Sequence, residues 1–237
     1  MKRSSKVNET VLKTLVSALI AAAIMLCGCV NASALQTSSG VCGDGLFWSV
    51  DDAGSLVISG TGEMSDYDAE NPAPWSGNEL TSAVVESGVT GIGDYAFAYC
   101  GGLKTLVLPA GLTRIGAMAF SDCVGITSLI IPESVDSIGS NAFFGCDNVT
   151  LYVYKESYAH LYAQMKRMAH KVISRGDYDG DGRITVADAL AALRVAAELA
   201  PETPEAIAIG DADGDGRITV SDALAVLRVA AKLKDSL

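Results

Sequence analysis

The sequence predicts an α+β protein of two parts, a short β-solenoid followed by a small all-α module. Two repeats predict this division: a 23-residue segment occurs three times in the middle of the 237-residue chain, and a loop-helix unit occurs twice near its end. One copy of the 23-residue segment cannot bury its own apolar face, so the copies are expected to stack. The net charge of −11 argues against nucleic-acid binding, which needs a basic surface.

Residues 1–34 are typical of a secretory signal peptide. A basic start precedes an apolar run at 15–30, and the small residues Ala32–Ala34 suit a signal peptidase. The 16 apolar residues fall short of the roughly 20 that span a bilayer, which argues against an uncleaved anchor. The segment "LCGC" leaves open a lipid on Cys29, the one case in which we expect membrane attachment. We expect cleavage after Ala34 and an extracellular protein.

Residues 35–79 predict a β cap for the open end of the solenoid. Apolar residues alternate along two strands joined by the turn Asp51–Gly54, as a hairpin requires. Such a cap is needed because an open end exposes the solenoid core. The acidic stretch Asp66–Glu70 leaves open an extra cation site, although we expect a solvated loop.

Residues 80–148 hold the three copies, which align without gaps. Each copy begins with a short apolar run, such as "TLVLP", that predicts a strand ended by proline. The repeated Gly is expected to turn the chain because it lacks the Cβ that restricts φ. The Phe and Cys that follow are expected to point inward from a turn too short for a helix. The repeated positions are Ile92/Ile115/Ile138, Gly93/Gly116/Gly139, Ala96/Ala119/Ala142, Phe97/Phe120/Phe143 and Cys100/Cys123/Cys146.

Four cysteines follow the predicted cleavage site: Cys42, Cys100, Cys123 and Cys146. Four cysteines in a secreted chain suggest disulfides, and equivalent cysteines on stacked coils lie close enough to form one. Three cysteines in a ladder cannot all pair, so we expect buried thiols that pack as small hydrophobes. Their redox state is left open.

Residues 149–173 predict a closing segment with a helix that carries both histidines, His160 and His170, on its surface. No Ser–His–Asp or Cys–His set is expected to converge, so we expect no enzyme. Paired acids for glycoside cleavage stay open, because the chain holds 28 acidic residues and chance pairs are common.

Residues 174–237 hold two 12-residue loops with acids at positions 1, 3, 5 and 12 and Gly at position 6. This pattern predicts two bound Ca²⁺ ions, because calcium takes carboxylate oxygens at these positions and a backbone carbonyl at position 7. The predicted ligands are Asp177, Asp179, Asp181, the Arg183 carbonyl and Asp188 in the first loop, and Asp211, Asp213, Asp215, the Arg217 carbonyl and Asp222 in the second.

Each loop is followed by a predicted helix, "VADALAALRVAAEL" or "VSDALAVLRVAAKL". Pro201 and Pro204 disfavour a helix before the second loop, so the unit reads as loop then helix. The two units are expected to pack about a pseudo-twofold, with Leu190, Leu193 and Leu199 facing Leu224, Leu227 and Leu233.

The repeat pattern "I–P–x–x–V–x–x–I–G–x–x–A–F–x–x–C" resembles the BspA-like leucine-rich repeat over about 41–173, which implies recognition of a protein or a surface. The paired loop-helix units resemble the type I dockerin module over 174–237, which implies calcium-dependent binding to a cohesin module of a scaffoldin. In that family, loop positions 10 and 11 and a position near 18 select the cohesin. The matching residues here are Val186, Ala187 and Arg194 in the first unit and Val220, Ser221 and Arg228 in the second. The near-identity of the halves suggests docking in two orientations.

The resemblances together predict a non-catalytic secreted protein of a cellulosome-type complex, associated with polysaccharide degradation. It would reach the cell surface through a scaffoldin. Two alternatives stay open. One is a cell-surface adhesin whose calcium loops are only structural, and the other is an unrecognised, docked carbohydrate-active enzyme.

Overall fold

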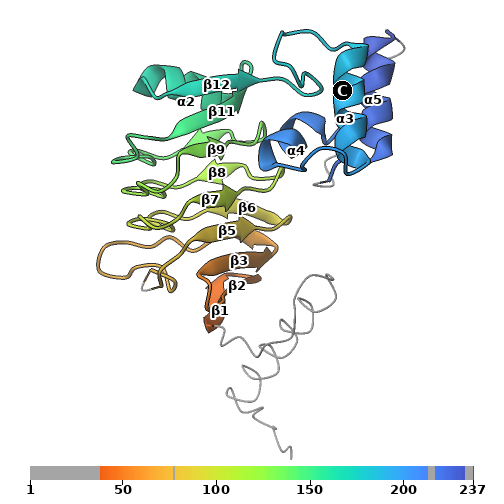
Figure 1. The fold of residues 1–237 in the computed structure, drawn as a ribbon. Helices are drawn as coiled ribbons and strands as arrows, with labels where there is room; N and C mark the ends of the chain where they lie inside the picture. The colour runs from red at the N-terminus through yellow and green to blue at the C-terminus, as the bar shows by residue number, and fades with distance from the viewer. Residues whose placement is uncertain (1–37, 77, 213–216, 233–236) are drawn as a thin grey trace, which may run out of the picture.

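The computed structural model describes residues 38–76, 78–212, 217–232 and 237, and it shows a solenoid with a helical module beside its last coils (Figure 1). The predicted signal peptide with Cys29 lies outside the described residues, as do Asp213, Asp215 and Leu233. The solenoid makes about five turns, which confirms the predicted fold class.

The solenoid begins with an antiparallel sheet that continues as a parallel one. The predicted hairpin is present, since β2 and β3 pair antiparallel across the turn at Asp51–Gly54, and β1 adds a third strand. The Asp51 carboxylate accepts hydrogen bonds from the N–H groups of Ala53 and Ser55 and so closes this turn. From β3 onward the pairing is parallel. The strands are β1 (Ser38–Gly43), β2 (Leu46–Val50), β3 (Ser55–Gly60), β5 (Ser82–Val85) and β7 (Thr105–Val107).

Two further sheets complete the coils. One has the strand order β10-β8-β6-β4, and its last three coils contribute strands that end at the repeated isoleucine. The other closes the solenoid in the order β12-β11-β9. The predicted strands at "TLVLP" and "SLIIP" are β7 and β9, whose central residues Leu106 and Leu129 are buried. The strands are β4 (Gly62–Glu63), β6 (Val89–Ile92), β8 (Arg114–Ile115), β10 (Ser137–Ile138), β9 (Ser128–Ile130), β11 (Thr150–Tyr154) and β12 (His170–Ile173).

The repeated glycines do not serve the purpose that we predicted. Gly93, Gly116 and Gly139 are absent from the described glycines with positive φ, so their backbone is one that other residues also adopt. Space is the constraint instead. A Cβ on Gly116 would lie 2.5 Å from the Asp94 nitrogen, and one on Gly139 would lie 2.4 Å from the Ala117 nitrogen. Glycine is needed here because neighbouring coils approach closely.

The repeated Phe and Cys fill the core as predicted. Phe97, Phe120 and Phe143 stack with ring centroids 5.5 and 5.2 Å apart. Each later cysteine points its thiol at the preceding coil: Cys123 Sγ lies 3.0 Å from the Phe97 carbonyl oxygen, and Cys146 Sγ lies 2.9 Å from that of Phe120. All four described cysteines are free and buried, so their thiols pack in the core and form no disulfides.

The solenoid ends with β11, the helix α2 (Tyr158–Lys166) and β12, which pairs parallel with β11. Tyr162 on α2 continues the row of aromatic rings 6.2 Å from Phe143. One detail of the prediction is wrong: His170 begins β12 and is not helical. Arg167 ends α2 in the left-handed conformation, which releases the chain into the strand. The two histidine rings are half-buried and lie 5.5 Å apart.

The helical module contains α3 (Val186–Ala196), α4 (Pro204–Gly210) and α5 (Val220–Ala230), and α3 packs on α5. The presence of α4 corrects our prediction that no helix precedes the second loop. Pro204 stands at the start of α4, where its missing N–H costs no hydrogen bond, and Thr203 caps the helix. In Figure 1, α4 lies between the solenoid and the other two helices.

The leucine pairing is also wrong for the described residues. Ala189, Ala192 and Val195 of α3 and Ala223 and Val226 of α5 are the buried apolar side chains of the two helices. Leu190 is 56% exposed and Leu224 is 44% exposed. Small side chains therefore fill the contact between the helices, and the leucines face outward.

Candidate functional site

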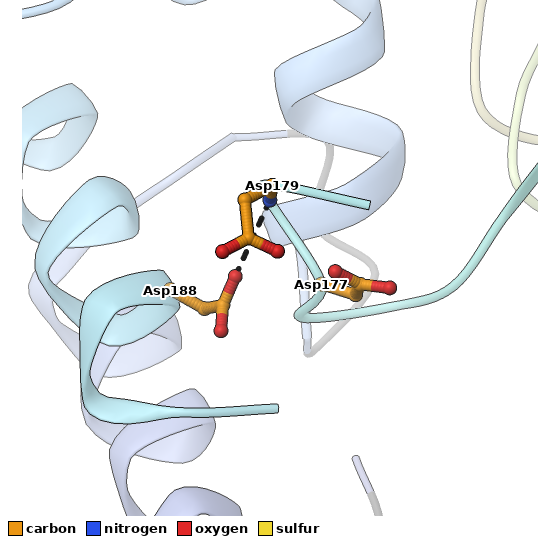
Figure 2. A group of neighbouring side chains, drawn as sticks. All are labelled: Asp177, Asp179 and Asp188. Carbon is orange, nitrogen blue, oxygen red and sulfur yellow. Dashed lines mark hydrogen bonds between the residues drawn. The ribbon is translucent and has the colours of Figure 1, made fainter. Parts of the chain in front are cut away.

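The first acidic loop brings three of its carboxylates together. Oxygen atoms of Asp177, Asp179 and Asp188 lie within 4.8 Å of one another (Figure 2). Asp177 and Asp188 are buried, and Asp179 is exposed. A cluster of hard oxygen donors on a short loop suits calcium, which takes six to eight oxygen ligands.

Asp177 shapes the loop around this cluster. Its carboxylate accepts hydrogen bonds from the N–H groups of Gly180, Asp181 and Gly182 at 2.8 to 3.1 Å. Gly180 and Gly182 have positive φ, which lets the chain fold tightly over the carboxylate. The loop backbone thus holds the first acid in place.

Asp188 joins the loop to α3. Its Oδ1 accepts hydrogen bonds from the Tyr178 and Asp179 N–H groups, and its Oδ2 accepts from both the N–H and the hydroxyl of Thr185. Thr185 and Asp188 form a capping box at the start of α3. Burial raises the pKa of the Asp188 carboxyl, but these hydrogen bonds together lower it by more. The net pKa therefore lies below its usual value.

The other two predicted ligands of the first loop occupy different places. Asp181 is exposed and is not in the group of three carboxylates; its Oδ1 accepts the Arg183 N–H at 2.8 Å. Arg183 is exposed. Three of the four carboxylates of this loop thus lie together, while Asp181 lies outside the group and is exposed.

The second loop repeats this design where the structure describes it. Asp222 accepts hydrogen bonds from the Ala212 N–H and from both Thr219 donors, and it forms a capping box with Thr219. Asp211 is buried, as Asp177 is, and Arg217 is exposed. The predicted ligands Asp213 and Asp215 lie outside the described residues.

The residues predicted to meet a partner all lie on the surface. Val186 and Val220, which begin α3 and α5, are 63% and 62% exposed. The remaining predicted contacts are exposed as well, namely Ala187, Arg194, Ser221 and Arg228. The two halves of the module therefore present matching sets of side chains.

Sequence reasoning missed four leucines of this surface, because it assigned them to the interior. Leu193 is 41% exposed and Leu227 is 38% exposed, in addition to Leu190 and Leu224. The alanines at 189, 192 and 223 were the available signal, since close helix packing favours small residues over leucine. Val186, Leu190 and Leu193 recur at helical spacing and so lie along one face of α3, and Val220, Leu224 and Leu227 do the same on α5.

Two acids of the stretch Asp66–Glu70, namely Asp66 and Asp68, accept hydrogen bonds from protein donors. Asp66 accepts the Asp94 N–H and pairs with Arg114 at 3.0 Å, and these hydrogen bonds lower its pKa below the usual value. Asp68 accepts the N–H groups of Glu70 and Asn71. The described part of this stretch is a hydrogen-bonded surface loop, as expected.

No described helix is long and apolar enough to cross a membrane.

Two family models match separate parts of the chain. Residues 74–165 match the BspA type leucine rich repeat region in six copies, and residues 175–229 match the dockerin type I domain. Both are non-catalytic kinds of module. Type I dockerin domains bind calcium and cohesin modules. No curated protein matches the chain.

Solved structures similar to the chain are also leucine-rich repeat proteins. One from Eubacterium ventriosum is 20% identical over 61% of this chain, with a TM-score of 0.42, and this chain spans 42% of its length. One from Bacteroides capillosus is 22% identical over 46% of this chain and 94% of its own, with a TM-score of 0.33. One from T. pallidum is 20% identical over 53% of this chain and 71% of its own, with a TM-score of 0.33.

Proposed function

We propose that this chain, which joins a BspA-type leucine-rich repeat region to a type I dockerin domain, is a secreted, non-catalytic component of a scaffold-bound complex. The dockerin binds a cohesin module when both loops hold calcium, and the solenoid recognises a protein or a surface. The complex is of the cellulosome type and serves polysaccharide degradation. One observation supports this proposal above the others: each of the two matching loop-helix units exposes an apolar stripe, while alanine and valine side chains are buried between the helices.

The calcium sites would fold the module and the helices would meet the partner. The acids at the first and last loop positions are buried in both units, and Asp177, Asp188 and Asp222 accept hydrogen bonds from the loop backbone. A bound Ca²⁺ supplies the positive charge that offsets the repulsion among these carboxylates. The exposed Val186 and Val220 lie at the starts of α3 and α5, at position 10 of each loop. Loss of calcium is therefore expected to remove the binding surface.

A cohesin capture experiment tests the proposal. Immobilised cohesin modules are incubated with the full chain in calcium and again in EDTA, and we expect capture only in calcium. The variant Val186→Glu with Val220→Glu should lose capture but keep its calcium affinity, because both positions are exposed and neither side chain is a predicted ligand. Val124→Glu, a matched change at a position of the solenoid that is 55% exposed, should bind as the wild type does. Equal capture in EDTA and in calcium would refute the proposal.

A further inference from the structure

The helical module is packed against the solenoid through α4. An apolar cluster connects the two parts, with Tyr154 and Ile173 of the last coils and Ile209 of α4 all buried. Partly buried side chains from both sides complete the cluster: Ile130, Tyr152, Tyr178 and Ala208. Ile130 and Tyr152 are register partners on β9 and β11, so they form one outward-facing row on the parallel sheet. The sheet thus offers α4 an apolar seat.

Polar contacts fix the position of α4 on this row. The Tyr154 hydroxyl donates to the Ala208 carbonyl oxygen at 2.7 Å. Lys171 of β12 pairs with Glu205 at 3.1 Å. The Arg175 guanidinium lies over the Tyr154 ring, 5.7 Å from its centroid. A hydrogen bond, an ion pair and a cation–π contact therefore surround the apolar cluster.

The same contact holds the beginnings of both calcium loops. Helix α4 ends at Gly210, so the first acid of the second loop, Asp211, follows it directly and acts as its C-cap. The first acid of the other loop, Asp177, follows Gly176, whose N–H donates to the Ile209 carbonyl oxygen at 2.7 Å. Gly210 lies so close to the Tyr178 hydroxyl that a Cβ there would clash with it. Gly176 is held near the solenoid because β12 ends only three residues earlier, at Ile173. A movement of α4 off the sheet that breaks the Gly176–Ile209 hydrogen bond therefore moves Asp211 away from Asp177.

We propose that the parallel sheet of the solenoid is the docking surface for α4, and that calcium binding in the loops and this intramolecular contact strengthen each other. Calcium then sets the orientation of the helical module on the solenoid. The reciprocity is thermodynamic: if calcium favours the docked state, the docked state must raise the calcium affinity by the same factor. The inference rests on the loops and the interface and does not require that the module bind a cohesin.

A solenoid residue far along the chain from both loops tests this coupling. Ile130→Thr weakens the apolar seat but keeps a β-branched, uncharged side chain on β9, so it adds no charge near the loops. Val84→Thr is the matched control, because Val84 faces outward on β5 of the same solenoid, is 41% exposed and is not part of the cluster. Tyr154→Phe is a second test that removes only the hydroxyl bonded to Ala208.

Calcium affinity is measured by titration calorimetry on the full chain, with Trp fluorescence to verify that the solenoid is folded. We expect Ile130→Thr and Tyr154→Phe each to weaken calcium binding about fivefold, the effect of one net hydrogen bond or a similar apolar contact. Amide exchange at Gly176 should rise by a similar factor, since its N–H is bonded to α4. Val84→Thr should change neither quantity.

Wild-type calcium affinity and unchanged Gly176 exchange in both Ile130→Thr and Tyr154→Phe would overturn the proposal. A wild-type chain that binds no calcium would overturn it too. Loss of cohesin capture with these couplings intact would refute the proposed function alone, so the two failures are distinguishable.

Discussion

Replacing Thr185 with valine is expected to destabilise the helical module by about 2 kcal/mol. The Thr185 hydroxyl accepts the Ala187 N–H at 3.1 Å and donates to Asp188 Oδ2 at 2.8 Å. Loss of an N-cap costs about 1 kcal/mol, and loss of a hydrogen bond to a charged group costs about 1.5 kcal/mol or more. Valine keeps the shape of threonine, and its slightly larger apolar surface offsets part of this loss. The substitution also leaves the charge of the loop unchanged.

Urea unfolding of the calcium-loaded chain, followed by circular dichroism at 222 nm, measures this loss. Thr185→Ser is the control, because serine keeps the hydroxyl and is an equally good N-cap, so it should stay within about 0.5 kcal/mol of the wild type. Thr219 repeats the geometry, with its hydroxyl 2.7 Å from Asp222 Oδ2, and Thr219→Val should cost about the same. Equal stability of the valine and serine variants would refute the claim that this hydroxyl organises the loop.

Three further predictions concern the solenoid and the partner surface. Burial raises the pKa of the Cys42 thiol from 9.0 to about 12. Iodoacetamide at pH 8 should therefore leave this thiol unmodified in the native protein, as mass spectrometry would show. The stability that the buried thiol contributes should be constant below pH 9 and fall as the pH rises towards 12, because the unfolded chain loses the proton first. Gly116→Ala should destabilise the solenoid by about 1–3 kcal/mol in urea melts because its Cβ meets backbone, whereas Gly111→Ala, with no atom within 4 Å, should not. If the module docks in two orientations, Arg194→Glu or Arg228→Glu alone should leave the cohesin affinity nearly unchanged in calorimetry, and the double variant should abolish binding. A large loss of affinity in either single variant would exclude two orientations.

Periodicity made the solenoid predictable. A Phe that recurs every 23 residues must occupy an equivalent place in each coil, so Phe97 and Phe120 could be assigned to the core from the sequence alone. The second sheet was not predictable in the same way, because β8 and β10 are only two residues long and show no alternation. The role of Gly116 was missed because a glycine in a sequence can mean either a special backbone conformation or a close approach of two segments. Only the structure shows that the neighbouring coil leaves no space for a Cβ.

The helical module was predictable in its loops but not in its packing. The acids and glycines of the first loop follow a spacing that only a few structures use, so Asp177 and Asp188 could be placed together. The helix contact depends on how close two backbones approach. That distance decides whether Leu190 or Ala192 lies between the helices. A prediction based on hydrophobicity alone placed the leucine there, because leucine is the more hydrophobic residue. The start of the short helix α4 did have a local signal, the Thr203 cap followed by Pro204. Its contact with β9 of the solenoid is long-range, and no local sequence pattern reveals it.

The row of aromatic rings in the solenoid core changes its geometry at both ends. Phe97, Phe120 and Phe143 are nearly parallel, at 22° to one another, but Tyr162 meets Phe143 at 61° and Trp48 meets Trp75 at 66°. Tyr162 and Trp48 are themselves buried, at 5% and 7% exposure, so the row of rings ends inside the chain on both sides. The stacking of the repeats is therefore closed at each end by an aromatic side chain of the protein's own caps, and no face of the phenylalanine row is left open to solvent.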